Sequence, residues 1–219
     1  MNDQLLLKFP QNKVFLKDDF YVSKSNKKAF DLIDCWPRWI RRIVNIYGPR
    51  GSGKTHLASI LKNKTRTMTI ESKNLKDQTF FEFKLTEVLV LENLQETISE
   101  NLLFSLYNFA LQDNKYILIT SKKSITEYSF KLPDLKSRIK DITIIGIDLP
   151  SDDLIGVILS KNFSDKQIKV EKRHIDYIVK RIDRSYEKIS QFILTLDKYS
   201  LKKGSPFSLK LIKEVIKMI

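Results

Sequence analysis

The sequence predicts an α/β domain with a phosphate-binding loop, built on a parallel five-stranded sheet between helices, followed by a small all-helical domain. A glycine-rich loop at 48–55 joins an apolar run to a helical pattern. Short apolar runs then alternate with helical patterns as far as residue 149, and only helical patterns follow. We therefore divide the chain into an N-terminal peptide (1–10), an α/β domain (11–149) and a helical domain (150–219).

The glycine-rich loop reads Gly-Pro-Arg-Gly-Ser-Gly-Lys-Thr and fits the phosphate-loop pattern G-x-x-x-x-G-K-[ST]. The β-branched run at 43–47 predicts a buried strand before it, so the loop opens a helix whose N–H groups and dipole favour phosphate. We expect Lys54 to reach the β- and γ-phosphates and Thr55 to offer its hydroxyl to Mg²⁺. An ordinary glycine-rich turn is the alternative. The expected contacts of the loop with a nucleotide are Gly48, Pro49, Arg50, Gly51, Ser52, Gly53, Lys54, Thr55 and His56.

The segment at 19–23 precedes this loop and is expected to line the adenine, with ordinary core packing as the alternative. Ser25 or Asn26 is suited to cap the helix that runs through 29–33. The residues of the segment with apolar faces and backbone groups for the base are Phe20, Tyr21 and Val22.

A second acidic pattern follows the apolar run at 88–91, which predicts a buried strand. In nucleotide-hydrolysing folds a first acid here helps to hold Mg²⁺, and a second polarises the attacking water. Glu92 fits the first role, with an ordinary solvated strand end as the alternative, whereas Asn93 cannot accept a proton. We therefore expect Thr55 and Glu92 to serve the metal and the catalytic base to be missing.

Thr120 follows a further apolar run, at the edge where open parallel sheets bind ligands. A hydroxyl in this place could sense the γ-phosphate or hold a water, and a simple helix cap is the alternative. The other elements expected in this domain are strands at 67–70, 116–119 and 142–147 and an amphipathic helix at 99–112.

Pro133 suits the first turn of a short helix that carries Arg138 at its end, just before the last strand. An arginine in this place can project from the domain edge into the nucleotide of a neighbouring subunit. The alternative is a solvated side chain that complements the helix dipole.

Helical periodicity dominates after residue 150, and Arg181 and Arg184 lie where one of them could swing toward the phosphates. His56 and His174 are far apart, so neither a zinc cluster nor a catalytic triad is expected. The helices are expected at 154–163, 171–182, 186–201 and 207–219.

Composition supports a globular protein, since 42% of the 219 residues are hydrophobic and 30% are charged. A single cysteine, Cys35, and the lack of a signal peptide or membrane-length apolar run predict a cytoplasmic location without a membrane partner. The net charge of +13 favours a polyanion, but the lysines are scattered. We therefore expect contact with DNA to be indirect or non-specific.

The N-terminal peptide contains Gln4-Leu5-Leu6-Leu7-Lys8-Phe9, which resembles the Q-L-x-L-x-F peptide that binds bacterial sliding clamps. Gln4 can hydrogen-bond at a pocket rim while Leu5, Leu7 and Phe9 act as apolar anchors. A first strand, or a tail packed on the domain, is the alternative.

Taken together, these residues resemble the AAA+ proteins, and more closely the DnaA-related regulators of the Hda (HdaA) family. The motifs occur in family order over nearly the whole chain: Q-L-x-L-x-F, D-F-x-V-S, L-I-D-x-W-P-x-W, G-P-x-G-S-G-K-T-H-L-A and L-P-D-L-x-S-R. The last, at 132–138, resembles the arginine-finger box, and Arg184 resembles the lid arginine called sensor II. Glu92 departs from the usual aspartate, whereas Asn93 also occurs in Hda-like proteins.

The resemblance implies an adaptor with bound ADP (or ATP) and Mg²⁺. It would sit on the DNA-loaded sliding clamp, the β subunit of DNA polymerase III, and press Arg138 against ATP held by DnaA. DnaA would then hydrolyse its ATP, and initiation would stop. A second copy of the chain, as in a homodimer, is a further candidate partner.

The sequence leaves two other classes of function open. One is an autonomous ATPase related to initiators or helicase loaders, although Asn93 argues against fast turnover. The other is a clamp- or DNA-binding module whose nucleotide only holds the fold. No helix-turn-helix pattern appears before Ile219, so we expect no reading of origin DNA.

Overall fold

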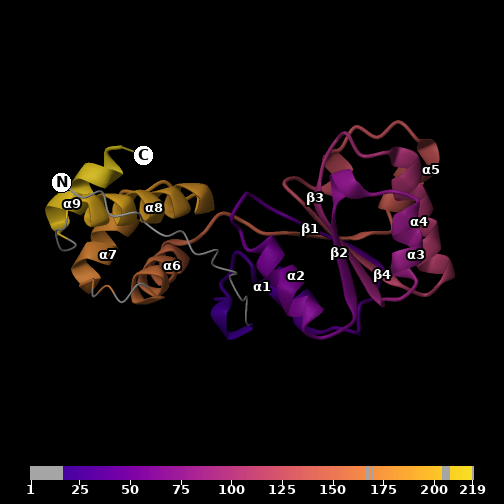
Figure 1. Ribbon diagram of the computed structural model, residues 1–219, viewed down its shortest axis with the longest axis horizontal. Coiled ribbons are helices and arrows are strands. Elements are labelled where there is room, and N and C mark those ends of the chain that lie inside the picture. Colours follow the sequence, from indigo (N-terminus) through magenta and orange to yellow (C-terminus); the bar gives the residue numbers. More distant parts are fainter. Residues whose placement is uncertain (1–16, 166–167, 169, 204–207, 219) are drawn as a thin grey trace, which may run out of the picture.

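The computed structural model describes residues 17–165, 168, 170–203 and 208–218 (Figure 1). The predicted clamp-binding peptide, with Gln4, Leu5, Leu7 and Phe9, lies outside the described residues. Within the described part of the chain, no helix is both long and apolar enough to cross a membrane.

Five parallel strands form one sheet in the order β2-β3-β4-β1-β5. The central strands are mainly apolar because helices cover both faces of the sheet. The predicted parallel five-stranded sheet is therefore confirmed. The strands are β1 (Ile43–Tyr47), β2 (Thr67–Glu71), β3 (Val88–Leu94), β4 (Tyr116–Ser121) and β5 (Thr143–Gly146).

Two layers of helices cover the sheet (Figure 1). Side chains alternate along each strand, so Val44 and Ile46 pack against α1 and α2, whereas Leu89 and Leu91 pack toward α4. The first layer is α1 (Lys27–Asp34) and α2 (Lys54–Lys62), and the second is α3 (Gln78–Phe83), α4 (Glu100–Gln112) and α5 (Pro133–Ile139). Short 3₁₀ helices lie at Lys17–Asp19, Ser72–Asn74 and Ile125–Glu127.

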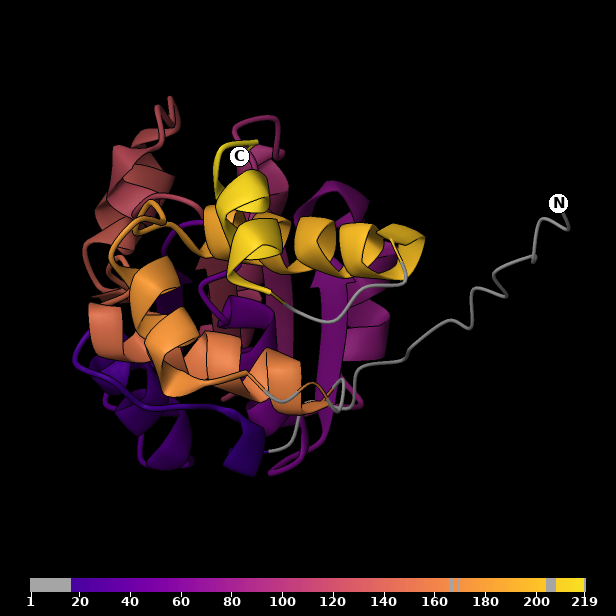
Figure 2. The same cartoon turned by 90° about the vertical axis from the view of Figure 1, so that its left-hand side faces the viewer.

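The C-terminal helices form a group with a core of its own, beside α1 and α2 (Figure 1). Figure 2 looks at this group, with the strands of the sheet behind it. Its most deeply buried side chains include Ile155, Leu159, Ile178, Phe192 and Ile212. The helices are α6 (Asp152–Asp165), α7 (Lys172–Val179), α8 (Tyr186–Lys203) and α9 (Leu209–Ile216), which confirms the helical character expected after residue 150.

Candidate nucleotide-binding site

The glycine-rich loop connects β1 to α2 at the carboxyl edge of the sheet. Gly51 and Gly53 adopt left-handed backbone angles, with φ of 82° and 91°, which other residues resist. Gly48 is needed for a different reason, because a Cβ there would lie 2.8 Å from the carbonyl oxygen of Ile147. Gly53 is the N-cap of α2, so the N–H groups of the first turn, which have no carbonyl partner within the helix, follow directly. These are the features of a backbone site for phosphate.

Lys54 is the buried cation of this loop. Its Nζ donates hydrogen bonds to the carbonyl oxygens of Gly48, at 2.7 Å, and Pro49, at 2.8 Å. Burial, followed by the positive charge of Lys122, lowers the pKa of Lys54 to about 8. The amine thus stays mainly protonated near pH 7, and an anion beside it would offset the electrostatic cost of its burial.

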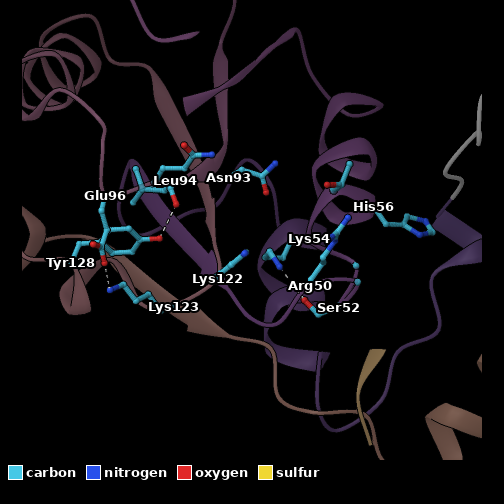
Figure 3. Close-up of a pocket in the computed structure, with 14 residues that line it drawn as sticks. Arg50, Ser52, Lys54, His56, Asn93, Leu94, Glu96, Lys122, Lys123 and Tyr128 are labelled. Atoms are coloured by element: carbon cyan, nitrogen blue, oxygen red, sulfur yellow. Dashed lines mark hydrogen bonds and ion pairs between the residues drawn. The ribbon is translucent and has the colours of Figure 1, made fainter. Parts of the chain in front are cut away.

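A large cavity, here called the loop cavity, opens beside this lysine and has a volume of about 940 Å³ (Figure 3). Its lining carries four cationic side chains and one carboxylate, Glu96, which pairs with Lys123 at 2.6 Å. The cavity therefore favours a multiply charged anion. The lining residues are Arg50, Gly51, Ser52, Gly53, Lys54, Thr55, His56, Asn93, Leu94, Gln95, Glu96, Lys122, Lys123 and Tyr128.

A second cavity of about 380 Å³, here called the lid cavity, lies between the α/β part and α6. It shares Gly51, Ser52, Gly53 and His56 with the loop cavity, so the two meet along the loop. Its other lining residues combine aromatic and aliphatic side chains, which an aromatic base could contact, with polar and charged ones. They are Asp19, Phe20, Tyr21, Asn26, Leu154, Val157, Ile158, Lys161, Asn162, Asp165 and Tyr186. A basic cavity joined to one that offers aromatic and aliphatic side chains suits the phosphates and the base of a nucleotide.

Asn26 shapes the segment predicted to line the base. It occupies the N-cap position of α1, but its side chain makes no capping hydrogen bond, so the predicted cap is wrong in that respect. Its Oδ1 accepts from the N–H of Ser23 at 2.8 Å, and its Nδ2 donates to the carbonyl of Tyr21 at 2.9 Å. The buried amide thus holds the segment at 21–23 in place, and Tyr21 of this segment lines the lid cavity.

The helical group touches both the loop and this segment. Lys161 of α6 donates to Asp19 at 2.6 Å. Tyr186, at the start of α8, donates its hydroxyl to the carbonyl of Asp148 at 3.3 Å. A Cβ on Gly51 would lie 3.1 Å from the Cβ of Tyr186, so α8 begins in direct contact with the phosphate loop. A ligand in the lid cavity would therefore contact both parts of the chain.

The residues predicted to serve the metal lie differently. Thr55 lines the loop cavity, whereas Glu92 does not, although its Oε1 is buried without a hydrogen-bond partner among the described residues. A water bound to Mg²⁺ would satisfy such an atom, since Mg²⁺ keeps several waters when it is held by phosphates. The described residues contain no cluster of three or more His, Cys, Asp or Glu side chains for a metal. The site therefore fits an ion carried by the nucleotide.

Thr120 lies behind the cavity rather than in its lining. It is buried, and its Oγ1 accepts the backbone N–H of Asn93 at 3.1 Å. Asn93 has a left-handed φ of 53° and lines the cavity in its place. This bond joins two strands and leaves no signal in the local sequence, and the contact of Thr120 with the γ-phosphate stays a prediction.

Arg184 pairs with Asp152 and lies outside both cavity linings. Its Nε and Nη2 donate to the two carboxylate oxygens at 2.8 and 3.0 Å. Its predicted contact with the phosphates would require this pair to break. Val22, Gly48 and Pro49 also lie outside both linings.

Several lining residues were not predicted as contacts. Lys122 and Lys123 directly follow β4, so their place at the carboxyl edge of the sheet was a usable signal. Tyr128 and Tyr186 come from a loop and a remote helix, and no local pattern marks them.

Arg138 is exposed in the last turn of α5. Its guanidinium lies 5.6 Å from the centre of the Tyr107 ring, and it lines neither cavity. Figure 1 shows α5 on the face of the sheet opposite α1 and α2. The side chain is thus on the surface beside an aromatic face, and no ion pair joins it to a carboxylate among the described residues.

The comparisons with known proteins agree with this geometry, although no family model matches the chain. The chromosomal replication initiator protein DnaA of Campylobacter jejuni is 27% identical to this chain over an alignment 239 residues long. The alignment covers 94% of this chain and 53% of that protein. The crystal structure of domain III of DnaA from Thermotoga maritima superposes with a TM-score of 0.79, at 20% identity. The superposition covers 95% of this chain and 98% of the domain III structure.

The chain is thus homologous to DnaA across this region. Its fold is the AAA+ fold of DnaA domain III, as predicted. The DnaA of Aquifex aeolicus bound to AMPPCP superposes with a TM-score of 0.70, at 18% identity, and covers 85% of this chain and 66% of that one. The chain spans about half the length of the curated DnaA proteins it matches.

Proposed function

We propose that the chain is a nucleotide-bound AAA+ adaptor of the Hda type. It holds ADP, docks on the DNA-loaded sliding clamp and stimulates hydrolysis of ATP bound to DnaA. The observation that carries this proposal is the exposed Arg138 on α5, outside the chain's own cavities. Such a guanidinium is free to act on a nucleotide held by another protein.

The two joined cavities support the nucleotide part of the proposal. The base would occupy the lid cavity, between Phe20 and Tyr186, and the phosphates would follow the loop toward Lys54. Mg²⁺ would neutralise phosphate charge, held by the phosphates, the Thr55 hydroxyl and waters that reach Glu92. The AMPPCP-bound neighbour from Aquifex aeolicus is in keeping with this use of the fold.

The missing carboxylate at position 93 supports action in trans. An asparagine cannot take the proton of the attacking water, so the chain's own site is expected to turn over slowly. An arginine finger stabilises the charge of the transferred phosphoryl group and contributes about 10³–10⁵-fold to hydrolysis in other systems. Arg138 would supply this group to DnaA.

The N-terminal peptide and the positive net charge indicate binding partners other than DnaA. Gln4, Leu5, Leu7 and Phe9 would bind the clamp, and a homodimer is a further candidate assembly. The net charge of +13 would add only non-specific attraction to DNA. The proposed adaptor would act in the cytoplasm.

Hydrolysis of DnaA-bound ATP tests the proposal, measured with this protein, ADP and DNA-loaded clamp, each omitted in turn. Arg138→Ala should lose nearly all stimulation, on the order of 10³-fold, while it still binds ADP and clamp. Lys136→Ala, an exposed cation on the same helix, is the matched control and should keep full stimulation. Unchanged stimulation by Arg138→Ala would refute the trans mechanism and favour a module with structural nucleotide.

The clamp-binding part needs its own variant. Changing Gln4 and Phe9 together to alanine should abolish retention on immobilised clamp and leave ADP affinity unchanged. Retention equal to that of the unaltered protein would remove this assignment.

A DnaA-like ATPase is the second candidate, because the curated relatives are replication initiators. ATP turnover by the isolated chain separates the two readings. Turnover of many ATP molecules per minute without DnaA would favour the initiator-like enzyme, whereas bound nucleotide with little turnover is the expected result for the adaptor.

A further inference from the structure

Helix α4 holds the start of α5 through Glu100. The two oxygens of the Glu100 carboxylate accept the N–H of Lys131, each at 2.9 Å, and one of them also accepts the N–H of Leu132 at 2.7 Å. Leu132 is the N-cap of α5, so these hydrogen bonds fix where the helix begins. The N–H groups of Leu132 and Lys131 lower the pKa of Glu100, so the carboxylate is ionised and makes these bonds near pH 7.

The same side of α4 meets the end of α5 two turns further on. Tyr107 lies seven residues after Glu100, which places both side chains on one side of the helix. The Tyr107 side chain is buried, and the guanidinium of Arg138 lies over its ring, 5.6 Å from the centre. Burial, followed by the charge of Asp141, raises the pKa of the Tyr107 phenol, so the ring is neutral near pH 7. Arg138 is therefore a cation held on a neutral aromatic face.

A contact of this kind leaves the hydrogen-bond donors of the guanidinium available. An arginine paired with a carboxylate uses its N–H groups on that partner, as Arg184 does when it donates to Asp152 at 2.8 and 3.0 Å. Asp141, three residues after Arg138, pairs instead with Arg41 at 3.9 Å. An aromatic face attracts the guanidinium through its charge, so the N–H groups of Arg138 can still donate to the oxygens of a phosphate.

We propose that Tyr107 is a positioning residue for the action of Arg138 on a nucleotide held by the partner. A long arginine side chain at an exposed helix end loses rotamer freedom when it meets its target. The Tyr107 ring limits that freedom beforehand, and Glu100 keeps the helix itself in place. This inference rests on the adaptor function proposed above and deepens it, because it names the residue that prepares the arginine for action in trans.

The test measures hydrolysis of DnaA-bound ATP at increasing concentrations of this protein, with ADP and DNA-loaded clamp present. Tyr107→Leu removes the ring, and the maximal rate should fall by about fivefold, which corresponds to the loss of a cation–π contact of ordinary strength. The protein concentration that gives half-maximal stimulation should stay within about twofold, since the ring is too buried to contact DnaA itself. Tyr107→Phe keeps an aromatic face and should keep the maximal rate within about twofold.

Tyr177→Leu is the matched control. The Tyr177 ring also lies beneath an arginine, with the Arg181 guanidinium 3.8 Å from its centre, but it belongs to α7 of the helical group. This change should leave the maximal rate unaltered. If Tyr107→Leu does not fold, Tyr107→Met replaces it, because methionine fills irregular core space without a ring, and it should show the same fivefold loss.

Two further measurements separate positioning from packing. In an Arg138→Ala background, Tyr107→Leu should lower the residual rate no further, because the ring acts only through that arginine. In nuclear magnetic resonance spectra, the Arg138 side-chain signals should be shifted by the ring in the unaltered protein and in Tyr107→Phe. The shift should disappear in Tyr107→Leu.

An unchanged maximal rate in Tyr107→Leu would overturn the inference, and so would a further loss of rate in the Arg138→Ala background. Equal losses in Tyr107→Phe and Tyr107→Leu would also overturn it, because the phenol rather than the ring would then matter. If Arg138→Ala loses stimulation while Tyr107→Leu keeps it, this inference fails alone and the adaptor stands. If the unaltered protein does not stimulate DnaA, the two fail together.

Discussion

Lys54 shows how one residue sets the chemistry of the loop. Its place at the end of an intact phosphate-loop pattern was predictable, because that pattern specifies both backbone and side chain locally. The contacts of Thr120 and Arg184 could not be predicted in the same way. Each depends on a partner distant in sequence, Asn93 for the threonine and Asp152 for the arginine. The sequence thus locates the loop and leaves its surroundings open.

The lowered pKa of Lys54 predicts how binding responds to pH. The cation that attracts phosphate is lost as pH rises through about 8, since burial disfavours the charged amine. ADP affinity should therefore fall between pH 7 and pH 9. A bound phosphate favours the charged amine, so binding near pH 8 should take up a proton. Calorimetry in buffers of different ionisation heat measures both effects. A constant affinity without proton uptake across this range would contradict this assignment.

At the scale of elements, periodicity predicted the five strands and the longer helices, because each buries an apolar face in its own period. The six-residue α3 was missed, since it is too short to show a helical period. The contact between the start of α8 and the phosphate loop was also beyond the sequence. It joins Gly51 to Tyr186, which lie far apart along the chain.

Gly51→Ala should disrupt this contact between elements. The φ of +82° and a Cβ 3.1 Å from that of Tyr186 both oppose the extra methyl group, so loop and α8 have to separate. Because the displaced loop no longer holds the phosphates in place, ADP affinity measured by calorimetry should fall by about tenfold or more.

Gly156→Ala is the matched control for that variant. It lies inside α6, and a Cβ there meets Ile175 and Val179 only at 3.9 and 4.0 Å. The change should leave ADP affinity unaltered and stabilise the protein by about 0.5–1 kcal/mol, measured by thermal unfolding. Equal ADP affinities of the two alanine variants would show that the contact between α8 and the phosphate loop does not affect ADP binding.

For the whole molecule, the charge and the two-part architecture have separate consequences. The α/β part and the helical group each have a core, and the lid cavity is lined from both. Composition and periodicity predicted the two parts, but not the cavity, since its lining comes from segments near 20, 52, 158 and 186. Only the folded arrangement brings these segments together.

The net charge of +13 predicts salt-sensitive attraction to DNA without sequence preference. Two unrelated duplexes should bind equally at 50 mM salt, and binding should weaken by on the order of 10³-fold by 200 mM salt if several phosphates are contacted. Fluorescence anisotropy measures both. Retention of one duplex over the other at the higher salt would contradict non-specific binding.

An adenine nucleotide is proposed to bind where the phosphate loop meets the helical group. Calorimetric titration of ADP into the unaltered chain, Lys54→Ala and the α2 control Lys62→Ala tests it most directly. We predict saturable binding that Lys54→Ala weakens by about tenfold or more and Lys62→Ala leaves unchanged, because Lys54 lines the loop cavity and Lys62 does not. Equal ADP affinity of all three proteins, or no binding by the unaltered chain, would contradict the account.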